Sequence, residues 1–349
     1  MRIQSLGFKK RLLFLFIMIN LCSSMWAEGN SWVNTDYNTT EGTDFWLTNM
    51  FNGGNTNLDT TDVKLRLFAV ARQQATVTIH YLQDNSQETF IVNANSKTVH
   101  PINLQKGYVF TENMVLQKGI HITSSSPISI YCVNQNSVVG SQDATCILPT
   151  SALGKEYVVQ TYSSDAFSTE FTLVTTQPTS NVSINVIRRD ETNPALDSTY
   201  VINTGPMQPG SAYMHRSNGA LFSLSGTTIC SDVPIAVFAG GQFAGIPNGY
   251  SNENHLYSQL SPISLWGKQF VIPNTYGTYI DYVRFSSAES NNSLQVLGAN
   301  NLYSVATTDI GAMGTYTDSI ELLTAPFSPK ANVYKTDKLT ESFLYLVAP

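Results

Sequence analysis

Two stretches of this chain repeat almost the same pattern about a hundred residues apart. One begins at Gly119 and reaches Pro127, the other begins at Gly226 and reaches Pro234, and both landmarks are offset by 107 residues. A period of this length is too long for a solenoid unit and fits a small domain. The chain is therefore predicted to contain tandem copies of one small module.

A second pair of landmarks closes each copy. Pro149 and Gly154 flank one short segment, and Pro262 and Gly267 flank the other, with an offset of 113 residues. Proline is favoured at the first position of a helical turn and glycine just after its end. These segments are predicted to be single helical turns that join neighbouring modules tightly.

The spacing divides the chain into a leader and three modules. The leader, a predicted signal peptide, covers 1–27. The predicted modules are module 1 at 28–153, module 2 at 154–266 and a more divergent module 3 at 267–349.

Short alternating segments in every module predict β-strands. In the stretch 64–70, for example, Leu65, Leu67 and Ala69 fall on one face. Seven such segments, separated by Asn, Gly, Asp and Ser clusters, fit an immunoglobulin-like sandwich of about 110 residues. The predicted fold class is all-β, with tandem immunoglobulin-like β-sandwich modules. A continuous β-propeller is the alternative, and it ranks second because its blades have four strands.

The first residues predict export. A basic start precedes the apolar run 12–19, and Ala27 is a small residue that suits cleavage. The run is too short to span a membrane, and no other stretch reaches the roughly 18 residues needed. We expect a secreted or cell-surface protein without a membrane span. Lipoprotein anchoring through Cys22 is the alternative, disfavoured by the bulky Leu21 before it.

Charge excludes one class of partner. The chain has 19 basic and 25 acidic residues, and loss of the four basic residues of the leader takes the net charge from −6 to −10. No basic field remains that would attract nucleic acid, so nucleic-acid binding is not expected.

No motif predicts catalysis, a cofactor or a metal. The chain lacks His-Glu-x-x-His, Gly-x-Ser-x-Gly and Cys-x-x-Cys. The histidines are scattered along it: His80, His100, His121, His215 and His255. We expect a protein that is not an enzyme and uses no cofactor.

Cysteine spacing predicts one disulfide. Cys132 ends a predicted strand and Cys146 begins the next, with 13 polar-rich residues between them. In an exported protein such a bridge would contribute roughly 3 kcal/mol by the loop-entropy estimate. Cys230 is left over and is predicted to be a buried thiol.

Two long polar segments are the candidate binding loops. The segments 134–145 and 240–255 occupy corresponding positions in modules 1 and 2 and differ in length. Variable loops on a rigid sandwich commonly carry recognition, although plain connecting loops are the alternative. The candidate contact residues are Asn134, Asn136, Asp143, Gln242, Asn248, Tyr250, Asn254 and His255.

Several motifs, in order, resemble the IgGFc-binding protein N-terminal domain family, which includes bacterial exported proteins. They are Gly42-Thr-Asp-Phe-Trp46, two Ile-x-Ser-x-x-Pro-Ile strands, two Pro-x-x-x-x-Gly-Lys-x-Tyr/Phe joints, and the stretch 254–262 that leads into the second joint. The resemblance covers about residues 42–285 and weakens beyond.

The resemblance implies a binding or adhesion protein. Its partner would be a host or matrix protein or glycan, with IgG Fc and mucin as candidates. The shared motifs are core and joint residues, so no ligand contact is transferred from the family. A structural spacer or assembly component is the alternative, and a hydrolase on a β scaffold ranks third.

Overall fold

The computed structural model describes residues 40–53, 62–247, 252–273, 280–289, 291–297, 304–310, 315–321 and 331–346. All of them belong to one compact unit, Thr40–Pro349. The predicted signal peptide and Cys22 lie outside the described residues.

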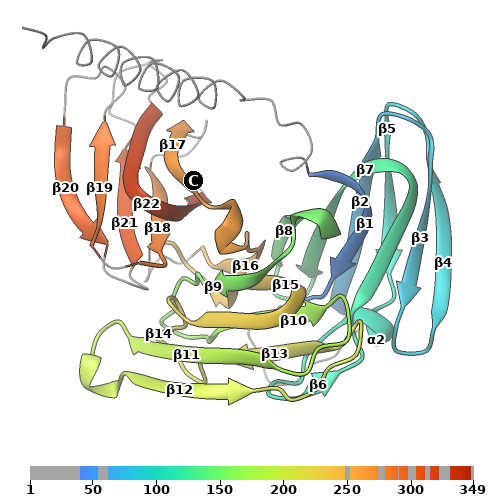
Figure 1. Ribbon diagram of the computed structural model, residues 1–349, viewed down its shortest axis with the longest axis horizontal. Coiled ribbons are helices and arrows are strands. Elements are labelled where there is room, and N and C mark those ends of the chain that lie inside the picture. Colours follow the sequence, from blue (N-terminus) through green and yellow to red (C-terminus); the bar gives the residue numbers. More distant parts are fainter. Residues whose placement is uncertain are drawn as a thin grey trace, which may run out of the picture. The chain divides into compact units, whose positions relative to one another are not determined.

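The described residues form three antiparallel sheets (Figure 1). The first sheet holds β1 (Glu41–Leu47), β2 (Val63–Ala71), β3 (Ala75–Tyr81), β4 (Ser86–Val92), β5 (Ser96–Ile102), β7 (Ile120–Asn136) and β8 (Ser141–Ile147). The second holds β6 (Val115–Leu116), β9 (Gly154–Val158), β10 (Thr169–Thr175), β11 (Val182–Asp190), β12 (Ser198–Asn203), β13 (Ala212–Arg216), β14 (Phe222–Ser223), β15 (Thr228–Ala244) and β16 (Asn254–Gln259). The third holds β17 (Gly267–Pro273), β18 (Ile280–Ser287), β19 (Asn292–Leu297), β20 (Ser304–Ile310), β21 (Thr315–Glu321) and β22 (Ala331–Leu346).

Helical structure is brief in the described part of the chain. It comprises α2 (Leu104–Gly107) and the 3-10 turns Thr150–Ala152, Pro194–Leu196 and Ile263–Leu265. The first and last of these three turns are the single helical turns predicted at the joints.

Each sheet is organised around one long strand. The first half of β7 pairs with β3 and β1, and its second half pairs mainly with β2 and β8. β15 and β22 take the same place in their own sheets. The two halves of the long strand thus pair with different neighbours and form two layers of strands. An apolar core lies between these layers. In module 1 this core includes Leu65 and Leu67 from β2 and Val77 and Ile79 from β3.

The sequence pattern predicts separate strands at 119–124 and 127–134 in module 1, and at 226–231 and 234–239 in module 2. In the structure each pair is one continuous strand, β7 and β15. Pairing of β7 with β3 ends at Ser124, and pairing with β2 begins at Ile128, so Pro127 lies where the strand changes partners. Pro234 takes the corresponding place in β15. Proline has no N–H to donate, so it is tolerated where no ladder hydrogen bond is required.

The all-β prediction and the β-sandwich modules are confirmed, and the propeller alternative is not. Each sheet folds around a shared long strand, whereas a propeller repeats separate four-stranded blades. With the exception of β6, which belongs to predicted module 1 and pairs in the second sheet, the strands of each sheet fall within one predicted module, and the module names are kept for them. That the modules are separate domains stays a prediction.

Glycines at the start of modules 1 and 2 explain the repeated spacing. A Cβ on Gly42 would lie 2.5 Å from Cβ of Pro149, and one on Gly154 would lie 2.4 Å from Cβ of Pro262. In both modules the start of the first strand therefore packs against the proline that ends the same module, and only glycine allows this approach.

The predicted disulfide is wrong, because Cys132 and Cys146 are both free thiols. Cys132 stands opposite Thr145, and Cys146 stands opposite Tyr131. Paired positions share a face and successive residues alternate, so the two thiols point to opposite sides of the sheet. Cys230, predicted to be buried, is exposed.

Candidate functional site

Most of the described residues in the segments predicted as binding loops lie on strands. Only residues 137–140 form the turn between β7 and β8. Asn248 and Tyr250 lie outside the described residues. The other candidate contact residues all lie on strands: Asn134 and Asn136 on β7, Asp143 on β8, Gln242 on β15, and Asn254 and His255 on β16.

Four of these residues meet between modules 1 and 2, where β8 lies beside β16 (Figure 1). We call them the polar seam: Asn134, Asp143, Asn254 and His255. Asn136 bonds within module 1, where its Nδ2 donates to the carbonyl oxygen of Asn52 at 2.9 Å. The amide nitrogen Nδ2 of Asn134 donates to the carbonyl oxygen of Met50 at 2.8 Å and lies 3.3 Å from Nε2 of His255. Modules 1 and 2 are thus joined by side chains that the sequence pattern had assigned to loops.

Backbone groups extend the polar seam. The backbone nitrogen of Gln142 donates to Oδ1 of Asn254 at 2.6 Å. That of Tyr257 donates to Oδ2 of Asp143 at 2.7 Å. Burial raises the pKa of Asp143 to about 6, against the backbone N–H groups of Tyr257 and Ala144, whose hydrogen bonds to its carboxylate lower it.

His255 is buried and neutral in the polar seam. Its Nδ1 lies 2.9 Å from the carbonyl oxygen of Gly241, so Nδ1 carries the proton and Nε2 accepts from Asn134. Burial lowers the pKa of His255 to about 4. The described seam residues hold modules together, and their part in ligand recognition stays a prediction.

An excursion of module 1 adds to the sheet of module 2. Residues 103–119 leave β5, and β6 within them pairs with β13. The backbone nitrogen of Asn113 donates to the carbonyl oxygen of Met214 at 2.8 Å, and that of Gly119 to Gly210 at 2.8 Å. No local sequence pattern marks this exchange.

A buried ion pair lies at the same junction. Oε2 of Glu170 lies 3.3 Å from Nε of Arg216, and the Glu170 side chain is fully buried. Arg216 also donates to the carbonyl oxygen of Phe110 at 2.7 Å and lies 4.5 Å above the ring centroid of Phe51. Burial raises the pKa of Glu170 to about 8, although the nearby guanidinium lowers it.

The titratable cluster on β1, β3 and β7 does not form a catalytic relay. Nε2 of His121 lies 2.7 Å from Oδ2 of Asp44, and the hydroxyl of Thr150 donates to the other oxygen of the same carboxylate. Both groups bond Asp44, and among the described contacts no hydrogen bond joins the histidine to the hydroxyl it would have to activate. Among the described residues, no group of three or more His, Cys, Asp and Glu side chains could hold a metal ion. In the same part of the chain, no helix is long and apolar enough to cross a membrane.

The outer face of module 1 carries an exposed apolar row. Val99, Phe68, Tyr131 and Cys146 stand opposite one another on β5, β2, β7 and β8. Val70 lies on the same face, two residues after Phe68. Val99 is 45% exposed, and Tyr131 and Val70 are each 42% exposed. We call these five residues the outer row.

The same positions in module 2 are buried. By strand pairing, the equivalents of Phe68, Val99 and Tyr131 are Thr172, Met214 and Phe238. All three are fully buried.

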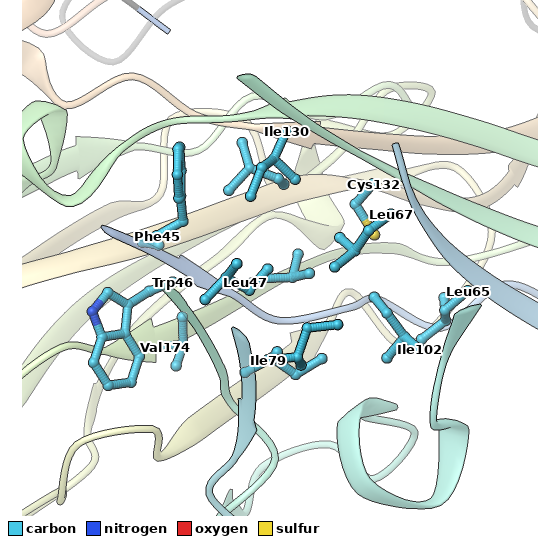
Figure 2. Close-up of a cluster of buried hydrophobic side chains, with 14 of the residues drawn as sticks. Phe45, Trp46, Leu47, Leu65, Leu67, Ile79, Ile102, Ile130, Cys132 and Val174 are labelled. Carbon is cyan, nitrogen blue, oxygen red and sulfur yellow. The ribbon is translucent and has the colours of Figure 1, made fainter. Parts of the chain in front are cut away.

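Module 1 covers this face of module 2. Met214 and Phe238 belong to the same apolar cluster as the core of module 1. Val174 of β10 lies in that cluster with Trp46 and Leu47 (Figure 2). The hydroxyl of Tyr257 donates to the carbonyl oxygen of Thr48 at 2.8 Å.

Module 2 contacts the corresponding face of module 3 in a similar way. Arg284 of β18 is 8% exposed, donates to the carbonyl oxygen of Thr161 at 2.6 Å and lies 4.5 Å above the ring centroid of Tyr162. The hydroxyl of Ser286 donates to Oε1 of Gln160. The outer row of module 1 is thus the exposed version of a face that modules 2 and 3 use for contact with the module before them.

Comparisons with known proteins give the family. The family model described as IgGFc binding protein matches residues 143–338, more than half of the chain. The chain belongs to the IgGFc-binding protein family. The human IgGFc-binding protein is 25% identical over 216 residues, which is 60% of this chain and 4% of that protein. This chain therefore spans a small part of the curated relative.

The family match differs in extent from the resemblance read from the motifs. It starts in β8, so Gly42–Trp46 and the first Ile-x-Ser strand lie outside it, and it continues beyond residue 285. Among solved structures, a tetra-tandem repeat from the extending region of a large adhesion protein is 14% identical. The match covers 80% of this chain and 67% of that one, with a TM-score of 0.16, which is too low to compare the folds.

Proposed function

We propose that this chain is an exported, non-enzymatic binding protein that takes a protein ligand on the outer row of module 1. The observation that carries the proposal is the exposure of the outer row, since its equivalents in module 2 are buried against a neighbouring module. Burial of apolar surface stabilises a complex by about 25 cal/mol per Å². Contiguous exposed apolar side chains are typical of interaction sites.

The chemistry of the outer row favours a protein over a glycan. Four of its five side chains, Val70, Phe68, Val99 and Cys146, lack a strong hydrogen-bonding group, and the fifth offers only the hydroxyl of Tyr131. A sugar needs several donors and acceptors for its hydroxyl groups. An apolar protein surface needs few, so it is the better complement.

The first ligands to test are IgG Fc and mucin. The human relative is named for binding IgG Fc, but this chain covers 4% of it, so that ligand is a candidate only. Export rests on the basic and apolar leader 1–27.

The test is biolayer interferometry of residues 28–349 against immobilised IgG Fc, mucin and a bare surface. The double variant Val99→Ser/Tyr131→Ser removes exposed apolar contacts and leaves the core intact. Val201→Ser on β12 is the matched control, because Val201 is 61% exposed and lies on another sheet. We expect saturable binding that weakens about tenfold or more in the double variant and not in the control. Undiminished binding of the double variant would place recognition elsewhere.

A structural role is the second candidate, and one observation favours it. Modules 2 and 3 both use this face to contact the preceding module of the same chain. A second copy could therefore add head to tail on the outer row, which is a non-closing contact that builds filaments. Sedimentation velocity over a wide concentration range tests it, with Val99→Ser/Tyr131→Ser expected to abolish any self-association.

A further inference from the structure

The outer row lies among cations. Lys64 and Arg66 precede Phe68 on the same face of β2, and Lys97 of β5 stands opposite Val70. Lys64 and Lys97 are exposed, and Arg66 is half-buried. None of the three side chains forms an ion pair with another described residue.

Carboxylates are few among the described residues of this face: Asp62 lies just before β2, two residues from Lys64, and is half-buried. The four strands β2, β5, β7 and β8 contain one acidic residue, Asp143. Asp143 stands opposite the buried Asn134 and accepts from the backbone of Tyr257, so it points away from the outer row. At the margin, Glu41 is engaged with Arg72 at 2.9 Å. In a chain with more acidic than basic residues, this face has the opposite sign to the whole.

The covered face of module 2 places a carboxyl group beside its arginine, and the described residues on the outer face of module 1 place none beside its cations. Strand pairing places Glu170 where module 1 has Arg66, and Arg216 where module 1 has Pro101. Glu170 and Arg216 pair with each other beneath module 1. On the outer face, by contrast, the compensating charges must come from whatever covers it.

On the basis of the proposed function, we infer that the ligand presents an acidic apolar surface. Its apolar side chains cover Phe68 and Tyr131, and its carboxylates meet Lys64, Arg66 and Lys97. A basic or uncharged partner would desolvate or crowd these cations without compensation. An acidic partner is also steered to the face and docks in one orientation.

The test uses three synthetic peptides and the mature chain, with binding followed by fluorescence anisotropy. The peptides share apolar residues at alternate positions and carry Glu, Lys or Ser between them. We expect the Glu peptide to bind about tenfold tighter than the Ser peptide at low salt, and the Lys peptide to bind weakest. The preference should fade at high salt, because exposed charges are then screened.

Charge variants assign the effect to the face. Lys64→Glu/Arg66→Glu/Lys97→Glu should invert the preference toward the Lys peptide, and Lys64→Gln/Arg66→Gln/Lys97→Gln should remove it. Thermal unfolding and circular dichroism check that both variants fold. If the triple glutamate variant does not fold, the triple glutamine variant still tests the role of the three cations.

The outcomes separate this inference from the proposed function. If the peptides bind the wild type and not Val99→Ser/Tyr131→Ser, but Glu and Ser peptides bind equally, the ligand is not acidic and the proposed function stands. If no peptide distinguishes wild type from that double variant, both are overturned. Heparin binding that depends on the three cations, without binding of the Glu peptide, would replace the protein ligand by an anionic glycan. Self-association lost in the double variant would identify a second copy as the occupant instead.

Discussion

One face of the repeated fold has opposite surroundings in modules 1 and 2. Tyr131 and Phe238 occupy the same position on the long strand, opposite Phe68 and Thr172 respectively. Tyr131 is 42% exposed, whereas Phe238 is fully buried and stacks with Tyr257 at 5.5 Å between ring centroids. The comparison teaches that topology places an aromatic side chain at this point, and that the neighbouring module decides whether it stabilises the fold or is free to bind.

The largest expected difference in stability is between two single variants, each of which truncates one member of this pair. Phe238→Ala should lower the free energy of unfolding by about 3–5 kcal/mol, because it leaves a cavity in a shared core. Tyr131→Ala should lower it by less than about 1 kcal/mol, because its side chain is half exposed. Urea unfolding followed by fluorescence measures both. Similar losses would show that the outer row is not a free surface.

The polar seam is expected to respond to acid. His255 has a folded pKa of about 4, below its unfolded value, so the unfolded chain takes up the proton first. The contribution of neutral His255 to the free energy of unfolding is complete above about pH 6.5 and is lost as the pH falls toward 4. The loss amounts to roughly 3 kcal/mol at most. Urea unfolding across this range should show the gap between wild type and His255→Gln closing in acid.

Measuring the difference in stability between wild type and His255→Gln removes the contributions of other buried groups that titrate in the same pH range. Burial raises the pKa of Glu170 and Glu341 to about 8, so their effect on stability runs the other way, with stability falling as the pH rises toward 8. Both carboxyls are present in wild type and in His255→Gln and cancel. A gap that stays constant with pH would mean that His255 is not held neutral in the folded chain.

A smaller effect is expected at the module starts. Gly154→Ala should destabilise by about 1–3 kcal/mol, because the new Cβ overlaps Pro262. Gly267→Ala should have little effect, because its nearest neighbour would be the Phe270 ring at 3.7 Å. Thermal unfolding of the two variants compares the same motif position with and without a closing proline. Equal losses of stability in the two variants would contradict the role given to the packing of Gly154 against Pro262.

The smallest effect is expected from the cysteines. Cys146→Ser should leave stability unchanged within about 0.5 kcal/mol, since no disulfide is lost. With a thiol reagent, the exposed Cys230 should react first, Cys146 more slowly and the buried Cys132 only after denaturation. Burial raises the pKa of the Cys132 thiol to about 12, which slows its reaction further. Mass spectrometry of the labelled chain gives the order of reaction. A mass lower by two hydrogens in the unreduced protein would show that a disulfide is present after all.

Much of the fold could be predicted because its signals are local. Alternation in 64–70 marks β2, and the repeated Pro and Gly mark the joints. The site could not be predicted in this way. Asn134 and His255 are 121 residues apart and meet only when two modules pack. The polar composition that suggested an exposed loop is equally suited to a buried seam whose hydrogen bonds are satisfied.

By itself the sequence determined most of the strands, the repeat and the family, because period, turn residues and ordered motifs act within short stretches of chain. Only the tertiary structure decided that the two thiols face opposite sides, that the candidate loop residues are buried, and that the outer row stays exposed. Burial and charge balance depend on what covers a side chain, and for Phe238 and Tyr131 that is settled by contacts between modules.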